Sequence, residues 1–146
     1  MIVLDSNVVS ELMRSRPAAP VLRWVEAQPA AELGTTSVTL AEVRYGIARL
    51  PDGRRKELLL AAAEDVFTTF ADRVLAFDAV AAVQYADIAA TRARAGDPIS
   101  GFDAQIAAVC RRHHATLATR NTDDFNRLGL DLLDPWTDDP GAAPLR

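Results

Sequence analysis

Short apolar runs alternate along this chain with longer segments in which apolar residues recur every three or four positions. The runs predict buried strands, because a strand packed on both faces is apolar throughout. These predicted strands cover residues 1–5, 33–37, 74–77, 115–119 and 130–133. The recurrent spacing predicts helices over 6–14, 21–27, 39–50, 54–70, 79–94 and 103–113. Strands that alternate with helices indicate crossover connections, so we expect an α/β fold with a central parallel sheet and helices on both faces.

Polar residues at the predicted helix starts match common capping patterns. Ser6 or Asn7 is the expected cap of the first helix. Thr39 and Glu42 match a capping box, in which the Glu42 carboxylate would accept the backbone amide of Thr39. Asp78 is the expected cap of the long helix that ends near Gly96.

Four polar clusters follow the predicted strands or start the helices after them. Asp5 closes the first strand, Glu42 lies in the first turn of the helix after the second, Asp103 starts a helix, and residues 121–124 follow the fourth strand. Ligands of open parallel sheets bind at the carboxyl ends of the strands, so we expect these acids to meet at one edge. Like charges that converge raise one another's pKa unless a cation neutralises them. The pattern therefore predicts a site for a hard divalent metal ion. Each acid, taken alone, is equally consistent with a helix cap.

Length and composition limit the remaining possibilities. The 146 residues suit one domain, which we place at 1–136, with a polar tail over 137–146. No apolar stretch is long enough for a membrane span, and Asp5 and Asn7 interrupt any signal peptide. The single cysteine, Cys110, excludes an internal disulfide and is typical of a cytoplasmic protein. A net charge of −4 argues against a broad basic surface, but a nuclease needs only local arginines around an acidic site.

Four sequence motifs, in this order, resemble those of the PIN-domain ribonucleases. They are IVLDSNV at 2–8, SVTLAEVRYG at 37–46, DAQIAA at 103–108 and TRNTDDF at 119–125. The resemblance covers residues 1 to about 136 and is greatest to the VapC toxins of type II toxin–antitoxin systems, in their FitB-like branch. It implies a three-layer α/β sandwich, Mg²⁺ or Mn²⁺ in an acidic pocket and hydrolysis of RNA phosphodiester bonds. It also implies a cognate antitoxin that neutralises the toxin, and a homodimer.

The resemblance assigns roles to individual residues. Asp5, Glu42 and Asp103 take the positions of the metal-binding and catalytic acids. Some members have Asp where this chain has Asn121, which brings an oxygen ligand but no charge. The missing anion would then come from Asp123 or Asp124, and Asp124 is the favoured candidate.

Further residues are expected to support that site. Asn7 and Thr119 would hold the acids in place. Arg44 or Arg120 would contact RNA phosphates. Leu12, Met13 and Trp24 could face an antitoxin or a second subunit, although a core position is the more natural place for Trp24.

Three other readings of the same residues are weaker. A phosphatase with Asp5 as nucleophile usually requires a second Asp at the position of Asn7 and a lysine near a strand end, whereas Lys56 lies within a predicted helix. Zinc at Cys110, His113 and His114 lacks the further ligands of a structural site. The third reading is a non-catalytic α/β binding module in which every acid is only a helix cap.

Overall fold

The computed structural model describes residues 1–141 and 143–145 of the chain. Its strands are β1 (Ile2–Leu4), β2 (Leu33–Thr36), β3 (Val74–Leu75), β4 (Thr116–Ala118) and β5 (Leu132–Leu133). Its α-helices are α1 (Ser6–Leu12), α2 (Ala19–Glu26), α3 (Ser37–Ala48), α4 (Arg54–Thr69), α5 (Ala79–Arg94) and α6 (Gly101–His113). Short 3₁₀ turns are η1 (Ala30–Glu32), η2 (Ala71–Arg73) and η3 (Thr122–Phe125). The prediction of alternating strands and helices is confirmed.

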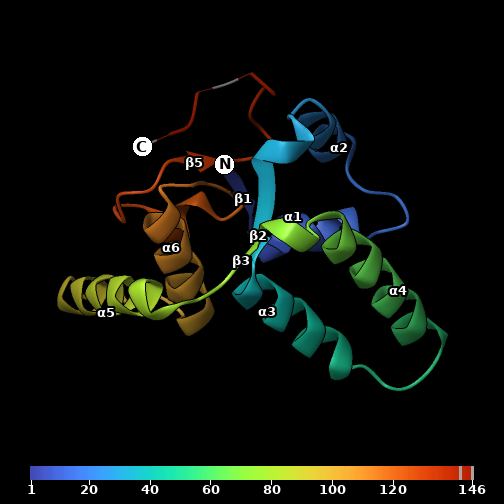
Figure 1. Ribbon diagram of the computed structural model, residues 1–146, viewed down its shortest axis with the longest axis horizontal. Helices are drawn as coiled ribbons and strands as arrows, with labels where there is room; N and C mark the ends of the chain where they lie inside the picture. Colours follow the sequence, from blue (N-terminus) through green and yellow to red (C-terminus); the bar gives the residue numbers. More distant parts are fainter. Residues whose placement is uncertain (142, 146) are drawn as a thin grey trace.

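The strands form one parallel sheet in the order β3-β2-β1-β4-β5. Helices α5 and α6 lie on one side of this sheet and α1, α2 and α4 on the other (Figure 1). Helix α3 extends away from the edge of the sheet that the carboxyl ends of the strands form. The predicted three-layer α/β architecture with a central parallel sheet is therefore confirmed. Because β1 lies in the middle, the strand order reverses between β1 and β4.

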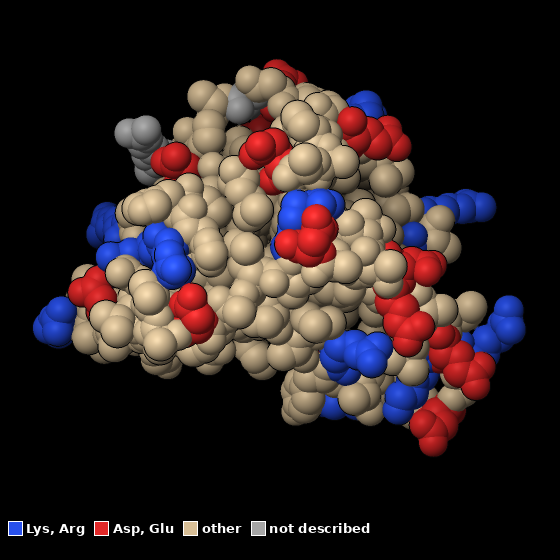
Figure 2. All heavy atoms as spheres, in the orientation of Figure 1, with Lys and Arg blue, Asp and Glu red and all other residues tan. Residues whose placement is uncertain are grey.

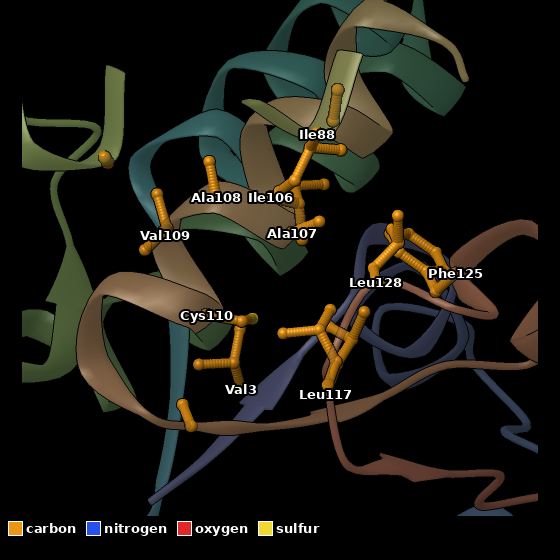
Figure 3. Close-up of a cluster of buried hydrophobic side chains, with 14 of the residues drawn as sticks. Val3, Ile88, Ile106, Ala107, Ala108, Val109, Cys110, Leu117, Phe125 and Leu128 are labelled. Atoms are coloured by element: carbon orange, nitrogen blue, oxygen red, sulfur yellow. The ribbon is translucent and has the colours of Figure 1, made fainter. Parts of the chain in front are cut away.

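Successive strand residues supply two separate cores, because neighbouring side chains of a strand point to opposite faces of a sheet. Val3 of β1 and Leu117 of β4 pack against α6, beside Cys110 and Phe125 (Figure 3). The next residues of the same strands, Leu4 and Ala118, belong to the core under α1–α4. Trp24 is 1% exposed within that second core, so the prediction that it is a core residue is correct.

Two predicted helix caps are wrong. The cap of α1 is Asp5, whose Oδ1 accepts the backbone N–H of Ser6 at 2.8 Å, and neither Ser6 nor Asn7 takes that role. The cap of α3 is Thr36, whose hydroxyl accepts the amide of Thr39 at 2.9 Å. The capping box predicted for Glu42 is therefore absent, because β2 ends one residue before α3 begins and its last residue already caps the helix.

The other helix starts agree better with the sequence pattern. Asp78 caps α5 as predicted, with its Oδ1 accepting the amide of Ala81 at 2.9 Å. Helix α6 begins two residues earlier than predicted, at Gly101, because the Ser100 side chain accepts the amide of Asp103. Asp103 therefore lies inside the first turn.

The end of the chain returns to the sheet. The backbone of Leu145 pairs with Leu132 of β5 in an antiparallel bridge, and the carbonyl of Pro140 accepts the side-chain amide of Gln28 at 3.1 Å. The division into a domain of 1–136 and a tail of 137–146 stays a prediction. Within the described ranges, no helix is both long and apolar enough to cross a lipid bilayer.

Candidate active site

The carboxyl ends of β1 and β4 bring the first and fourth motifs together. The two strands pair in parallel, with Leu4 opposite Ala118, so the residues that follow them start at the same height. The backbone N–H of Asp5 extends this pairing and donates to the carbonyl of Ala118 at 3.0 Å. The strand order reverses at this position, and α/β sheets bind their ligands in the crevice outside the carboxyl ends of the strands at such a reversal.

Hydrogen bonds hold the Asp5 carboxylate in one orientation. Thr119 donates its hydroxyl to Oδ2 at 2.7 Å, the side-chain amide of Asn7 donates to the same oxygen at 3.2 Å, and the Ser6 amide donates to Oδ1. Both carboxylate oxygens therefore have fixed directions, as a rigid ligand or general base requires.

Thr119 and Asn7 also organise the loop after β4. The Thr119 oxygen accepts the side-chain amide of Asn7 and the backbone N–H of Asn121, each at 3.1 Å. The side-chain oxygen of Asn7 accepts the amide of Arg120 at 3.2 Å. These contacts tie α1 to the fourth motif, as the supporting role predicted for Asn7 and Thr119 requires; that role in activity stays a prediction.

Burial makes the Asp5 carboxyl hard to ionise. Asp5 is 2% exposed, and the loss of water raises its pKa to about 6 against the hydrogen bonds from Thr119 and Ser6, which lower it. The negative charges of Asp103 and Glu42 raise this pKa further, so both acids lie close enough to act on Asp5. A cation bound at this position would instead lower the pKa of Asp5.

Glu42 reaches the same site from the second turn of α3. The residue is half-buried, and its Oε1 atom is shielded from solvent without a hydrogen-bond partner in the described part of the chain. A buried carboxylate oxygen without a donor costs free energy, which a bound cation would recover. Since Thr36 caps α3, Glu42 has no capping function that would explain its position.

Asp103 is the third acid of the site. Its half-buried carboxyl lies in the first turn of α6, where burial raises its pKa and the charge of Asp124 adds to the increase. The hydrogen bond with Ser100 acts in the opposite direction.

The three acids line one pocket of about 580 Å³. Asn7 and Asn121 line it as well, together with Met13, which follows α1, and apolar side chains of α3 and α4. Asp123 and Asp124 are exposed and lie outside its lining. Of the residues 121–124, only Asn121 belongs to the lining of this pocket. The metal-binding role predicted for Asp124 stays a prediction.

The arrangement suits a hydrated hard cation better than a closed cage of protein ligands. Across residues 1–141 and 143–145, no three His, Cys, Asp or Glu side chains stand close enough together to enclose a metal ion. Mg²⁺ usually keeps several water ligands and binds proteins through one or two carboxylates. The oxygen donors, the buried Asp5 and the unpartnered Oε1 of Glu42 fit such an ion.

The other candidate residues, Arg44, Lys56 and Arg120, do not belong to the lining of the pocket. Arg44 is 3.9 Å from Glu64, and the Arg120 guanidinium stacks over Trp136 at 5.2 Å. Lys56 donates to the carbonyls of Ala48 and Leu50, away from the acids.

Cys110 is fully buried in the core, where burial raises the pKa of its thiol (Figure 3), while His113 and His114 are exposed. These positions fit the core role predicted for Cys110.

Sequence reasoning missed one charged residue of the pocket. Arg55, in the first turn of α4, lines the same cavity as the three acids. It follows the turn at residues 51–53 and belongs to no recognisable motif, so only the packing of α4 beside α3 and α1 reveals it.

The family model and the similar proteins agree on one family. The family model described as PIN domain matches residues 2–130. A VapC ribonuclease, Y4jK, of Sinorhizobium fredii is 41% identical over 137 residues, which are 93% of this chain and 98% of that protein. Toxin FitB of Neisseria gonorrhoeae is 35% identical over 139 residues, 94% of this chain and all of that protein.

A solved structure agrees with the sequence match. The structure of FitAB bound to an IR36 DNA fragment superimposes with a TM-score of 0.86 at 34% identity, covering 95% of this chain and 98% of that chain. Together with the parallel five-stranded sheet and the pocket at the switch between β1 and β4, these matches show that the chain belongs to the PIN-domain family.

Proposed function

We propose that this protein is a metal-dependent endoribonuclease of the VapC toxin type, which hydrolyses RNA phosphodiester bonds. The observation that carries the proposal is a single pocket that contains the buried Asp5 carboxylate, the unpartnered Oε1 of Glu42 and Asp103. A helix-capping role accounts for Asp5, but leaves Glu42 unexplained. The names of the VapC and FitB relatives support the same activity.

Asp5, Glu42 and Asp103 would hold Mg²⁺ or Mn²⁺, with Asn121 and Asp124 as further oxygen donors. When bound, such an ion supplies positive charge at the scissile phosphate and makes a water molecule easier to deprotonate. Asp5 is oriented for this purpose by Thr119, Asn7 and Ser6. Asp103 is the half-buried acid with a raised pKa, and it would orient the attacking water and accept its proton.

The partners follow from the same proposal. RNA is the substrate, and a cognate antitoxin would neutralise the toxin, as the assembly of FitB in the FitAB structure suggests. A homodimer and a cytoplasmic location complete the proposal. The location agrees with RNA as the target and with Cys110, which is a free thiol.

The test is cleavage of a structured RNA by the wild type, Asp5→Asn and Asp103→Asn, each with 5 to 10 mM MgCl₂ or with EDTA, on the order of the ion concentrations used for weak magnesium sites. We expect cleavage only by the wild type with the ion, and a loss of at least about 100-fold for each variant. Asp139→Asn is the matched control, because Asp139 is exposed and outside the pocket. Full activity in EDTA, or unchanged cleavage by both pocket variants, would reject the nuclease.

A further inference from the structure

We propose that a groove beside the acidic pocket, between the end of α1 and the start of α4, binds the nucleotide next to the scissile bond, with Arg55 contacting its phosphate. The inference rests on the proposed function and names where the RNA strand leaves the pocket. Neither the family match nor the acidic motifs assign this groove to RNA.

The groove lies directly beside the acidic pocket. It has a volume of about 690 Å³ and is lined by Met13, Arg14, Ser15, Arg54, Arg55, Leu58 and Leu59. Met13, Arg55 and Leu59 also line the pocket that contains the acids. The two cavities therefore adjoin, and an RNA strand whose phosphate lies at Asp5 and Glu42 would reach the groove past these three side chains.

Among the described residues, Arg54 and Arg55 of this groove lack an acidic partner, whereas the third arginine, Arg14, pairs with Glu11 at 3.4 Å. Arg44, Arg73, Arg92 and Arg111 each form an ion pair with an acid. For Arg54 and Arg55, neither an ion pair nor a hydrogen bond of the guanidinium occurs within the residues that the structure describes. Both side chains are exposed, so their charges are available to a ligand.

The composition of the groove fits single-stranded RNA. Arginine binds phosphate in a bidentate manner, and apolar or planar surfaces accept the faces of unpaired bases. Arg54 and Arg55 supply the first contact, and Met13, Leu58 and Leu59 the second; Leu58 is 56% exposed. Figure 2 shows acidic and basic side chains interspersed over one face of the protein, so on that face no continuous basic patch competes with a local groove.

The experiment measures RNA binding separately from cleavage. A fluorescein-labelled single-stranded RNA of mixed sequence is titrated with protein carrying Asp103→Asn, so that the RNA stays intact in Mg²⁺, at several salt concentrations. Each lost phosphate contact lowers the slope of log affinity against log salt by roughly 0.7 for a single strand. We expect a decrease of roughly 0.7 for Arg55→Gln and roughly 1.4 for Arg54→Gln/Arg55→Gln, with at least about a fivefold loss of affinity at low salt.

Two further variants separate the subsite from general effects of charge and folding. Arg55→Lys keeps the charge and should keep the salt slope, although affinity falls because the bidentate contact is lost. Arg94→Gln removes the same charge at the end of α5, where Arg94 is exposed and donates a hydrogen bond to the hydroxyl of Thr91, and it should leave the slope unchanged. Unfolding midpoints close to that of the parent protein would show that each variant is folded.

Cleavage kinetics distinguish failure of this inference from failure of the nuclease itself. In the otherwise wild-type enzyme, Arg55→Gln should raise KM about fivefold or more and change kcat less than twofold, because the contact lies beside the reacting phosphate. If the wild type cleaves RNA but the double variant keeps its salt slope and KM, the groove does not bind RNA. An equal loss in Arg94→Gln would also overturn the inference. If the wild type does not cleave RNA at all, the proposed function fails first.

Discussion

The Thr119 hydroxyl donates a 2.7 Å hydrogen bond to Oδ2 of Asp5, although the two residues are 114 positions apart in the sequence. They follow the adjacent strands β4 and β1, and the bond is buried. Thr119 also accepts hydrogen bonds from Asn7 and Asn121, so one hydroxyl joins three parts of the site.

Replacing Thr119 by Val should therefore affect both stability and acidity. The variant keeps the shape but removes the hydroxyl, and we expect the free energy of unfolding to fall by about 1–3 kcal/mol. The pKa of Asp5 should rise, because the Thr119 bond lowers it in the native protein. The acidic limb of the pH profile of kcat/KM should move to higher pH. Thr119→Ser, which keeps the hydroxyl, is the control, and equal profiles for both variants would contradict the role of this bond.

The raised pKa of Asp5 predicts that the metal-free protein loses stability as pH rises. The folded state holds the Asp5 proton up to a pKa of about 6, whereas the unfolded state releases it near the ordinary value of 3.8. Between these values the native state binds more protons, so the Asp5 contribution falls by up to about 3 kcal/mol from pH 4 to pH 7. Asp5→Asn should be more stable than the wild type above pH 6 in EDTA, and the difference should vanish near pH 4. Urea unfolding at several pH values measures it; a difference independent of pH would disprove the burial argument.

Asn121 offers a direct test of the charge at the metal site. Asn121 lines the pocket, so Asn121→Asp adds a fourth carboxylate beside Asp5, Glu42 and Asp103. We expect Mg²⁺ to bind about tenfold more tightly, because the number of charged ligands sets the affinity of such sites. Titration of the unfolding temperature with MgCl₂ measures the change. Asp124→Asn should weaken binding less than Asp103→Asn does, and the reverse order would show that Asp124 is the closer ligand.

Arg92 is predicted to hold the fourth motif in place from α5. The side chain is 8% exposed and donates to the carbonyls of Asp97 and Asp124 at 2.7 and 3.0 Å. Arg92→Met should lower the free energy of unfolding by about 2–4 kcal/mol, because these partly buried hydrogen bonds to two carbonyls are lost. The acid that pairs with Arg92, Asp97, is 73% exposed, so Asp97→Asn should cost less than about 1 kcal/mol. Urea unfolding of both variants tests the contrast, and similar losses would refute it.

Substitutions of Thr36 and Glu42, at the start of α3, should have opposite effects on the stability of the metal-free protein. Thr36→Val removes the cap of α3 and should lower the free energy of unfolding by about 1 kcal/mol. Glu42→Gln should leave the stability of the metal-free protein unchanged or increased, because Oε1 has no partner in the described chain. The same variant should abolish the stabilisation by Mg²⁺. A loss of stability for Glu42→Gln in EDTA would indicate that Glu42 supports the helix after all.

Much of the fold could be predicted from the alternation of apolar runs and helical patterns. Strand β1 and helix α5 illustrate the reason: their apolar spacing and the cap at Asp78 are local properties of the sequence. Exact helix starts were less predictable, since Asp5 and Thr36 are the last residues before their helices and compete with the neighbouring Ser6, Asn7 and Thr39 for the capping role. Which of several adjacent polar residues caps a helix depends on where the preceding strand ends.

By itself, the sequence determined the α/β class and the parallel sheet, because hydrophobic periodicity and strand ends are local properties of the chain. It also determined which acids the family motifs mark. Only the tertiary structure decided that Asp5, Glu42, Asp103 and Asn121 line one pocket, that Asp124 lies outside its lining, and that Arg55 lines it from α4. The physical reason is that convergence depends on the order of the strands and the packing of helices distant in sequence. These place Thr119 against Asp5 and bring Arg55 and Leu59 of α4 to the pocket that contains the acids.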